Sequence, residues 1–182
     1  RLIERVLPGG AADPDMESAL VAFKRYYTGH CNVHTRPYEG IAETMAALNE
    51  AGVKLGIVSN KNDAAVKALA QAYFGSLVSA VVGGRDGVPR KPAPDMPLIA
   101  LAALGVEPER TLYVGDSDVD VQTARNTGMD CILVAWGFRT EEELAGVASY
   151  YRVSDAAEIP ALALQSAEIG RASCRERVFR TV

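Results

Sequence analysis

Three aspartates crowd the end of an apolar stretch in the segment YVGDSDVDVQTARNTG, residues 113–128. Asp116, Asp118 and Asp120 fall within five positions, and carboxylates this close repel one another unless another charge offsets them. A divalent cation would do so, because Mg²⁺ favours octahedral coordination by hard oxygen ligands. The alternative is structural: acidic residues near the first turn of a helix serve as caps and interact favourably with the helix dipole.

A hydroxyl, an amide and a lysine could complete a site for phosphoryl chemistry. Ser59 and Asn60 follow the apolar stretch 53–58, and Lys91 stands in the segment RDGVPRKPAPD. A serine hydroxyl and backbone N–H groups can hold phosphate oxygens, and lysine neutralises charge as a compact cation. Phosphoryl transfer is catalysed mostly by such positioning and electrostatic stabilisation. Taken singly, Ser59 could be a helix cap and Lys91 a solvated side chain; together with the aspartates they indicate phosphoryl chemistry.

Strand-like and helix-like segments alternate through most of the chain, and the strands are nearly all apolar. This pattern predicts an α/β fold, a Rossmann-like parallel sheet with flanking helices on both faces. Ligands bind beyond the carboxyl ends of the strands in such sheets, so we expect Ser59, Lys91 and Asp116 at one edge of a single sheet. The strands predicted for this sheet are 53–58, 78–82, 111–115 and 130–134. The predicted helices are 15–30, 62–74, 93–104, 120–128, 140–147 and 154–166.

The composition argues against two classes of partner, nucleic acid and membrane. The 182 residues are 48% apolar, enough for one domain with a core and a small appendage, and the formal net charge is −4. A nucleic-acid-binding face would need a basic patch, and no apolar run approaches the roughly 18 residues that span a membrane. The three cysteines, Cys31, Cys131 and Cys174, are far apart, which favours a reducing, cytoplasmic location without a disulfide framework or a zinc site.

Three ordered segments resemble motifs of the haloacid dehalogenase-like hydrolases. IVSNK (57–61) resembles the family's second motif, RKPAPD (90–95) the third, and VGDSDVDVQTARNTGM (114–129) the acidic fourth motif. The resemblance covers residues 1–165. It implies a haloacid dehalogenase-like core, Mg²⁺ as cofactor, and hydrolysis of a small phosphorylated metabolite through an aspartyl-phosphate intermediate.

A finer likeness is to the phosphoglycolate phosphatases within this family. It is carried by HTRPYEGI (34–41), VVGGRD (81–86) and VAWGF (134–138). Related phosphatases, pyrophosphatases and phosphomutases share much of this pattern, so they stay open as alternatives. The resemblance leaves the exact substrate and the oligomeric state undetermined.

The resemblance implies a role for each matching residue. Ser59 would bind the transferring phosphoryl group with Asn60 beside it, and Lys91 would stabilise the nucleophile and the phosphoryl intermediate. Asp116 would be a direct Mg²⁺ ligand. Asp120 would support the metal shell or orient Lys91. The aspartate between these two stands at a variable position of the family pattern and receives no catalytic role.

The family's first motif, D-x-D-x-T after the first strand, has no counterpart far upstream of Ser59, where it is expected. The chain starts with RLIERVLPGG, which resembles cap sequence, and Asp13-Pro14-Asp15 matches the motif by letters only, because no apolar strand precedes it. We therefore expect a chain without its amino-terminal part, which would hold the nucleophile and the central strand, the one between those ending at Ser59 and Asp116. Such a fragment is expected to be inactive alone.

These observations predict three regions. Residues 1–35 would be the carboxyl-terminal part of a helical cap, and residues 36–168 a Rossmann-like hydrolase core without its first strand. The segment 169–182 holds four arginines against one glutamate, and we expect it to be a non-native tail such as a cloning or read-through scar.

Other classes of protein compete with a phosphatase. An inactive phosphate-binding interaction module, such as a phosphoacceptor receiver, also uses acids, a hydroxyl and a lysine on a parallel sheet. Its acidic pair comes early in the chain, however, whereas here the acids come last. A dinucleotide-binding domain would need G-x-G-x-x-G after an early strand, and none is present. His30 and His34 stand four apart, a possible metal spacing, but no carboxylate partner accompanies them.

Overall fold

The computed structural model describes residues 2–149 and 151–170. The chain divides into two compact units, residues 1–36 and 37–182. No helix in the described part of the chain combines the length and the apolar character that a membrane crossing requires. Most of the predicted tail 169–182 lies outside the described residues, and Cys174 lies outside them as well.

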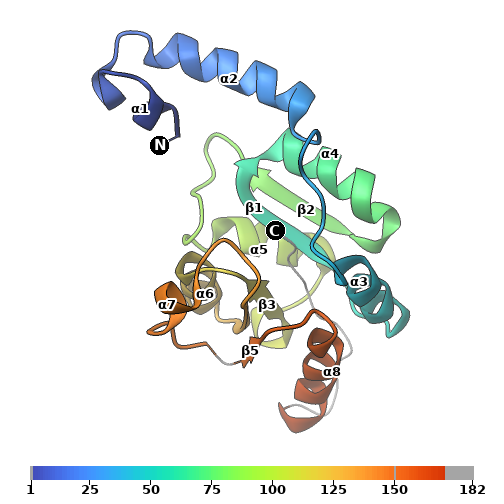
Figure 1. Ribbon diagram of the computed structural model, residues 1–182. Coiled ribbons are helices and arrows are strands. Elements are labelled where there is room, and N and C mark those ends of the chain that lie inside the picture. The colour runs from blue at the N-terminus through green and yellow to red at the C-terminus, as the bar shows by residue number, and fades with distance from the viewer. Residues whose placement is uncertain (1, 150, 171–182) are drawn as a thin grey trace. The chain divides into compact units, whose positions relative to one another are not determined.

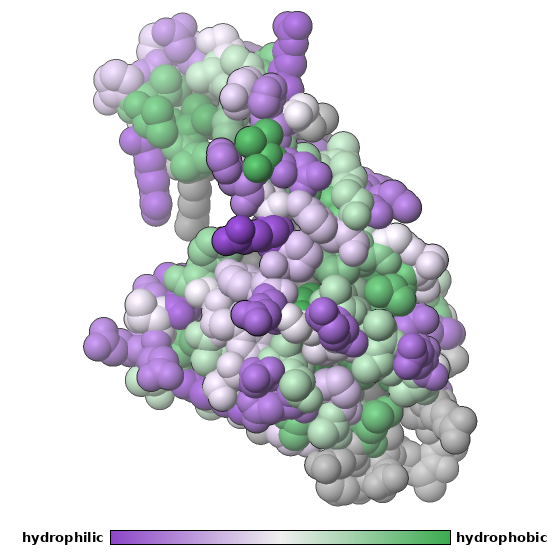
Figure 2. All heavy atoms as spheres, turned by 45° about the vertical axis from the view of Figure 1, so that its right-hand side comes forward, coloured by the Kyte–Doolittle hydropathy of each residue, from purple (hydrophilic) through white to green (hydrophobic). Residues whose placement is uncertain are grey.

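The first unit is helical. It contains α1 (Leu2–Val6), a 3₁₀ turn (Gly10–Ala12) and α2 (Met16–His30), which confirms the helix predicted over 15–30. Many of its large apolar and aromatic side chains are exposed, and green, hydrophobic side chains lie on the surface that Figure 2 shows. The exposed ones are Leu2, Val6, Leu20, Val21, Tyr26 and Val33.

The two patterns in this unit that resemble functional motifs form ordinary local structure. The ring of His30 stacks on that of Tyr26 with 3.9 Å between centroids. No group of three metal-ligating side chains that could hold an ion occurs among the described residues. Asp13 accepts hydrogen bonds from the backbone N–H groups of Gly9 at 2.8 Å and Asp15 at 2.9 Å. The D-x-D sequence therefore closes a turn before α2 and does not follow a strand.

The second unit contains parallel strands in the order that the sequence predicts (Figure 1). Every hydrogen-bonded pair is parallel, and this confirms the α/β class. The strands are β1 (Gly56–Asn62), β2 (Ala80–Gly84), β3 (Leu112–Gly115), β4 (Asp130–Val134) and β5 (Tyr151–Val153). The last of these is not predicted, because three residues carry too little alternation to indicate a strand.

Helices follow and separate these strands. All the helices predicted for this unit are present with shifted ends, and one further helix precedes β1. Its side chains Ile41, Met45 and Leu48 are buried at helical spacing, a pattern that the turn signals just before it obscure. The helices are α3 (Ile41–Glu50), α4 (Asp63–Phe74), α5 (Asp95–Leu104), α6 (Asp118–Thr127), α7 (Glu141–Leu144) and α8 (Glu158–Gly170).

The prediction of a single sheet is wrong, because the strands form two hydrogen-bonded sheets, β1–β2 and β3–β4–β5. No ladder joins β1 to β3 within the described residues, and this is the position at which the family resemblance places a further strand. Both sheets nevertheless contribute side chains to the same two apolar clusters. Ile57 of β1 packs in one apolar cluster with Val114 of β3, and Val58 packs in a second cluster with Tyr113.

Helices cover both faces of these strands. Residues of α3, α4 and α8 pack in the first apolar cluster, and residues of α5 and α6 in the second. Along β4, Ile132 and Val134 join the first cluster, whereas Cys131 and Leu133 join the second, as the twofold alternation of a strand requires. Each fully buried aliphatic side chain contributes about 1.5–3 kcal/mol. The two layers therefore fix the strand ends on which the polar residues stand.

Candidate active site

Polar side chains stand at the carboxyl ends of β1 and β3. Ser59 and Asn60 lie in the second half of β1, where the pairing with β2 is irregular between Val58 and Asn62. Asp116 follows β3 directly. These are the ends at which ligands bind in parallel α/β sheets. Ser59, Asn60 and Asp116 are therefore candidate ligand-binding residues.

Lys91 and Asp120 form a buried ion pair. Nζ of Lys91 lies 2.9 Å from Oδ1 of Asp120, and the two side chains are 3% and 1% exposed. The hydroxyl of Tyr113 lies 3.5 Å from the same oxygen, and the centre of its ring lies 6.0 Å from Nζ. This burial excludes the interpretation of Lys91 as a solvated lysine. Because a charge removed from water is costly unless it is paired, each of the two residues depends on the other.

The second oxygen of Asp120 is also engaged. Oδ2 accepts hydrogen bonds from the backbone N–H of Asp116 at 3.2 Å and from the hydroxyl of Ser117 at 2.6 Å. Gly115 makes room for this carboxylate, since a Cβ at that position would lie 2.8 Å from Oδ2 and still closer to the Cβ of Asp120. Of the two roles expected for Asp120, this geometry favours the orientation of Lys91.

The side-chain amide of Asn60 ties the end of β1 to the backbone of Lys91. Nδ2 donates a hydrogen bond to the Lys91 carbonyl oxygen at 3.1 Å, and Oδ1 accepts one from the Lys91 N–H at 2.9 Å. Both halves of the amide are thus used within the protein. Through Asn60, Lys91 and Asp120, the three segments that carry the motif resemblance form one connected hydrogen-bonded set.

The hydroxyl of Ser59 can still donate a hydrogen bond. Its oxygen accepts one from the backbone N–H of Lys61 at 3.3 Å, and no described residue accepts one from it. A hydroxyl carries one donor in addition to its acceptor positions. The half-buried Ser59 side chain is therefore suited to donate to an oxygen of a phosphoryl group.

Asp116 has one carboxylate oxygen that accepts no hydrogen bond from a described residue. The residue is 5% exposed, and its Oδ2 accepts a hydrogen bond from the backbone N–H of Phe138 at 3.0 Å. Its Oδ1 accepts none from any described residue. This oxygen is not one of the buried side-chain atoms that lack a partner, so it still reaches solvent. A carboxylate oxygen that is accessible and accepts no hydrogen bond is suited to a cation, and Mg²⁺ takes one or two carboxylates and keeps waters for its other positions. The residues present therefore fit Mg²⁺ with Asp116 as the ligand.

Asp118 faces outward from the same run. Its side chain is 59% exposed and lies 3.2 Å from Arg139, which also lies 3.1 Å from Glu143. The backbone N–H of Thr140 and the charge of Arg139 hold the pKa of Glu143 below its ordinary range, against an opposing effect of desolvation and of Asp118. The three aspartates thus differ in their partners: one is open to a cation, one is at the surface, and one holds a lysine.

Tyr38 also belongs to the surroundings of Asp116. The sequence gives it no such role, because Pro37 and Gly40 beside it indicate a turn and HTRPYEGI (34–41) carries only the finer family likeness. Burial, followed by the negative charge of Asp116, raises the pKa of the Tyr38 phenol above its ordinary value of 10.0. The phenol therefore stays neutral at physiological pH. Two further neighbours of Asp116, Gly137 and Phe138, stand in the segment VAWGF, which carries only the finer family likeness. Their contacts with Asp116 were not predicted, because these contacts use space and a backbone N–H rather than a side chain.

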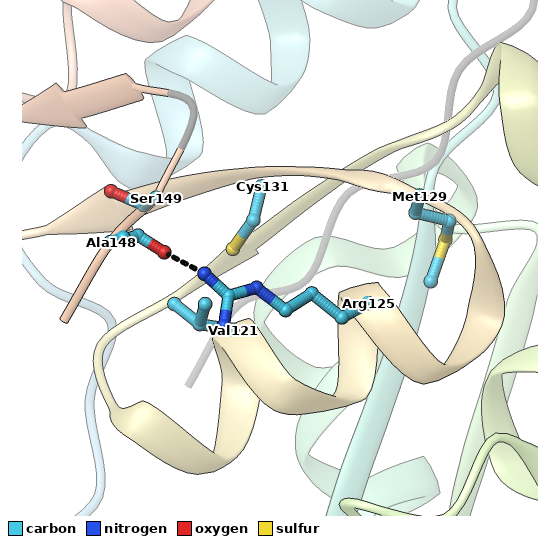
Figure 3. Close-up of a pocket in the computed structure, with 6 residues that line it drawn as sticks. All are labelled: Val121, Arg125, Met129, Cys131, Ala148 and Ser149. Atoms are coloured by element: carbon cyan, nitrogen blue, oxygen red, sulfur yellow. Dashed lines mark hydrogen bonds between the residues drawn. The ribbon is translucent and has the colours of Figure 1, made fainter.

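A cavity of about 380 Å³ lies along α6, between this helix, β4 and the segment that precedes β5 (Figure 3). Arg125 lines the cavity and donates a hydrogen bond from Nη2 to the carbonyl oxygen of Ala148 at 2.8 Å. Among the described residues that line the cavity there is no carboxylate. The lining residues are Val121, Arg125, Met129, Cys131, Ala148 and Ser149.

Comparison with known proteins places these residues in a family context. The model of the family described as haloacid dehalogenase-like hydrolase matches residues 10–134. The chain is 35% identical over 138 residues to the phosphoglycolate phosphatase of Aquifex aeolicus, covering 75% of the chain and 63% of that protein. It is 34% identical over 131 residues to the N-acetylmuramic acid 6-phosphate phosphatase of Pseudomonas aeruginosa, covering 71% and 58%. The chain thus spans about three fifths of the length of these two relatives.

A solved structure shows the same arrangement of elements. It is that of a protein assigned as a phosphoglycolate phosphatase from Lactobacillus delbrueckii subsp. bulgaricus, with a TM-score of 0.78 and 38% identity. The match covers 86% of the chain and 66% of that protein. The parallel strands and flanking helices are therefore those of a haloacid dehalogenase-like phosphatase fold.

Proposed function

Because the chain belongs to the haloacid dehalogenase-like hydrolase family, we propose that it carries most of the active site of a Mg²⁺-dependent phosphatase. The substrate is a small phosphorylated metabolite, and phosphoglycolate is the first to test, since a relative of that activity is 35% identical to the chain. The observation that carries the proposal is the buried Lys91–Asp120 pair, which is bonded to the end of β1 on one side and to Asp116 on the other.

Each residue then has a defined task. The hydroxyl of Ser59 donates to a phosphoryl oxygen, and the ammonium of Lys91 stabilises negative charge on the nucleophile and the phosphoryl group. Asp120 pairs with the ammonium of Lys91 at 2.9 Å and so orients it, and Asn60 fixes the Lys91 backbone. Asn60 therefore positions the lysine, and contact with substrate through its side chain would require these bonds to change.

Asp116 and Asp120 serve the metal unequally. Asp116 binds Mg²⁺ directly through Oδ1. Asp120 supports Asp116 indirectly, because its Oδ2 accepts a hydrogen bond from the backbone N–H of Asp116 at 3.2 Å. When bound, Mg²⁺ supplies positive charge that offsets the negative charge of the transferring group. The hard oxygen donors of this site are the type that Mg²⁺ prefers.

The nucleophile of the proposed reaction is an aspartate on a strand inserted between β1 and β3. Two features support this placement: these neighbours are not paired with each other, and both contribute to the same two apolar clusters. Asp13 and Asp15 lie in a turn of the first unit, so neither stands at the end of a strand. We therefore expect residues 1–182 alone to turn over little phosphoglycolate, and residues 1–35 to act as part of a helical cap.

The test compares two versions of the protein with Mg²⁺ and phosphoglycolate. The 182-residue chain should be nearly inactive, and the same chain preceded by a strand that ends in D-x-D-x-T should hydrolyse the substrate. In the extended chain, Lys91→Ala should lower turnover by about a hundredfold or more, because it removes a positioned charge. Lys67→Ala is the matched control, since that lysine is 52% exposed and pairs only with Asp63 at the surface.

Four outcomes would contradict parts of this proposal. Hydrolysis by the 182-residue chain that is lost on Lys91→Ala would place the nucleophile among the residues already present. Phosphate binding without turnover by the extended chain would favour an interaction module. Hydrolysis of a pyrophosphate in preference to phosphoglycolate would move the assignment to a related pyrophosphatase, and isomerisation of a sugar phosphate without release of phosphate would move it to a phosphomutase.

A further inference from the structure

The segment from Trp136 to Arg139, which follows β4, contacts two of the three clustered aspartates. The backbone N–H of Phe138 donates to Oδ2 of Asp116 at 3.0 Å. The next residue, Arg139, pairs with Asp118 at 3.2 Å. Two successive residues of this segment are thus bonded to two different aspartates, and nothing in the motif resemblance assigns a role to either contact.

Gly137 lies against the carboxylate that it helps to place. A Cβ added at this position would lie 2.6 Å from Cγ of Asp116 and still closer to its Cβ and Oδ2, below the 3.0 Å that Cβ atoms keep from other heavy atoms. Gly137 is not among the glycines with a positive φ. Glycine is therefore required here by space, because the backbone passes in contact with the Asp116 side chain.

The far end of the segment is anchored independently of Asp116. Arg139 also pairs with Glu143 at 3.1 Å. Thr140 caps α7 by a reciprocal pair of hydrogen bonds with Glu143. The side chain of Phe138, in contrast, is 81% exposed, so this residue acts on Asp116 through its backbone. A segment held at one end can impose a fixed orientation on the carboxylate at its other end.

We propose that Gly137 and the backbone N–H of Phe138 are the positioning elements of Asp116: they hold its Oδ2 so that Oδ1 is presented to the metal. This inference rests on the proposed metal-binding role of Asp116. A carboxylate that could rotate would offer either oxygen, or both, and would lose rotational freedom on binding. Groups that orient a metal ligand through hydrogen bonds commonly change metal affinity by 10- to 100-fold.

The first test detects the contact without any metal, by thermal unfolding of the chain. Gly137→Ala should lower the melting temperature by about 5 °C or more, on the scale of a few degrees per kcal/mol for a chain of this length. In an Asp116→Gly background the same substitution should have little effect, because the side chain that it would strike is gone. Equal shifts in the two backgrounds would show that Gly137 and Asp116 are not coupled and would overturn the proposal.

The second test measures binding of Mn²⁺, as a spectroscopic substitute for Mg²⁺, from the signal of the free ion. The unsubstituted chain should bind one ion, Asp116→Ala should lose it, and Gly137→Ala should bind about tenfold more weakly. Gly146→Ala is the matched control, because a Cβ there meets no atom within 4 Å. Phe138→Pro, which removes the N–H donor, gives a second reading if Gly137→Ala does not fold.

The outcomes separate this inference from the function on which it rests. If Asp116→Ala loses Mn²⁺ while Gly137→Ala and Phe138→Pro bind it as tightly as the unsubstituted chain, the positioning role is wrong and the metal ligand stands. If the unsubstituted chain and Asp116→Ala behave alike toward Mn²⁺, the metal assignment itself fails and the inference fails with it. The unfolding test would still report whether the Gly137–Asp116 contact exists.

Discussion

The two ends of α6 differ in what they bury. At the amino end, the carboxylates of Asp116 and Asp120 are buried, and three of their four oxygens accept hydrogen bonds. At the carboxyl end there is open space of about 380 Å³, bordered by apolar side chains and by the exposed cation Arg125. The signs of charge follow the helix dipole, which favours anions at the amino end and cations at the carboxyl end.

The contrast shows that empty volume and chemical capability need not coincide on one helix. The cavity extends from Val121 in the first turn of α6 to Met129 beyond its last residue, and none of the aspartates at the amino end lines it. Apolar side chains that line a cavity need no hydrogen-bond partners, so such a cavity can form without precisely placed polar groups. Buried carboxylates, in contrast, need donors or cations around each oxygen, and such an arrangement requires several elements to be placed together. The amino end of α6 is therefore a better candidate for function than the cavity that Figure 3 shows.

The largest expected effect comes from removing a buried acid, Asp120, and comparing the result with removal of an exposed acid, Asp118. Asp120→Ala should lower the free energy of unfolding by about 3–5 kcal/mol, because it leaves the ammonium of Lys91 buried without its carboxylate. Asp118→Ala should cost less than about 1 kcal/mol, since it breaks a surface pair with Arg139. Urea unfolding measures both. Similar losses would mean that burial at this end carries no special energetic weight.

Catalysis should distinguish Asp116, the other buried acid of this run, from the exposed Asp118. In a chain that carries the nucleophile, Asp116→Ala should lower Mg²⁺-dependent turnover by about a hundredfold, because it deletes a charged metal ligand. Asp118→Ala should change turnover by less than about threefold, as expected of a surface ion pair. Steady-state rates over a range of Mg²⁺ concentrations measure both effects. Equal losses from the two substitutions would remove the distinction between a buried metal ligand and an outward-facing acid.

The sequence predicts the placement of the site better than the contacts within it. Apolar strands followed by Ser59 and Asp116 are enough to predict a parallel α/β fold with polar groups at its strand ends, because strand alternation and turn signals are local properties. The same reasoning places Lys91 between them in the chain. It cannot predict that Lys91 is buried, since burial depends on where the loop returns in space.

The elements that were missed share a physical cause. Gly137 and the N–H of Phe138 act through close approach and backbone hydrogen bonding, which leave no distinctive side chain in the sequence. The grouping of strands into two sheets depends on which strand lies beside β1 and β3, and residue types do not specify neighbours in space. Tyr38 was hidden by the turn residues around it, although its phenol is influenced by the charge of Asp116.

The carboxyl end of α6 should tolerate change. Arg125→Ala removes one hydrogen bond, to the carbonyl oxygen of Ala148, from an exposed side chain, so it should change the free energy of unfolding by less than about 1 kcal/mol. Turnover of the extended chain should be unaffected within error. Urea unfolding and a phosphoglycolate assay check these expectations. A loss of turnover comparable with that of Asp116→Ala would give the cavity a functional weight that the comparison denies it.

The smallest expected effect concerns the rim of the acidic run, where Arg139 links Asp118 to Glu143. The pKa of Glu143 is held below its ordinary value of 4.5, first by the backbone N–H of Thr140 and then, against desolvation, by Arg139. Because the folded-state pKa is depressed, the contribution of Glu143 to stability is present above the unfolded-state pKa and is lost as the pH falls through the folded-state pKa. Arg139→Gln should therefore raise the pKa of Glu143 but leave it below 4.5, since the larger cause is unchanged. Carboxyl resonances followed by NMR through an acid titration measure this shift. A Glu143 pKa in the variant at or above the ordinary value would show that Arg139, and not the backbone N–H of Thr140, is the main cause of the lowered pKa.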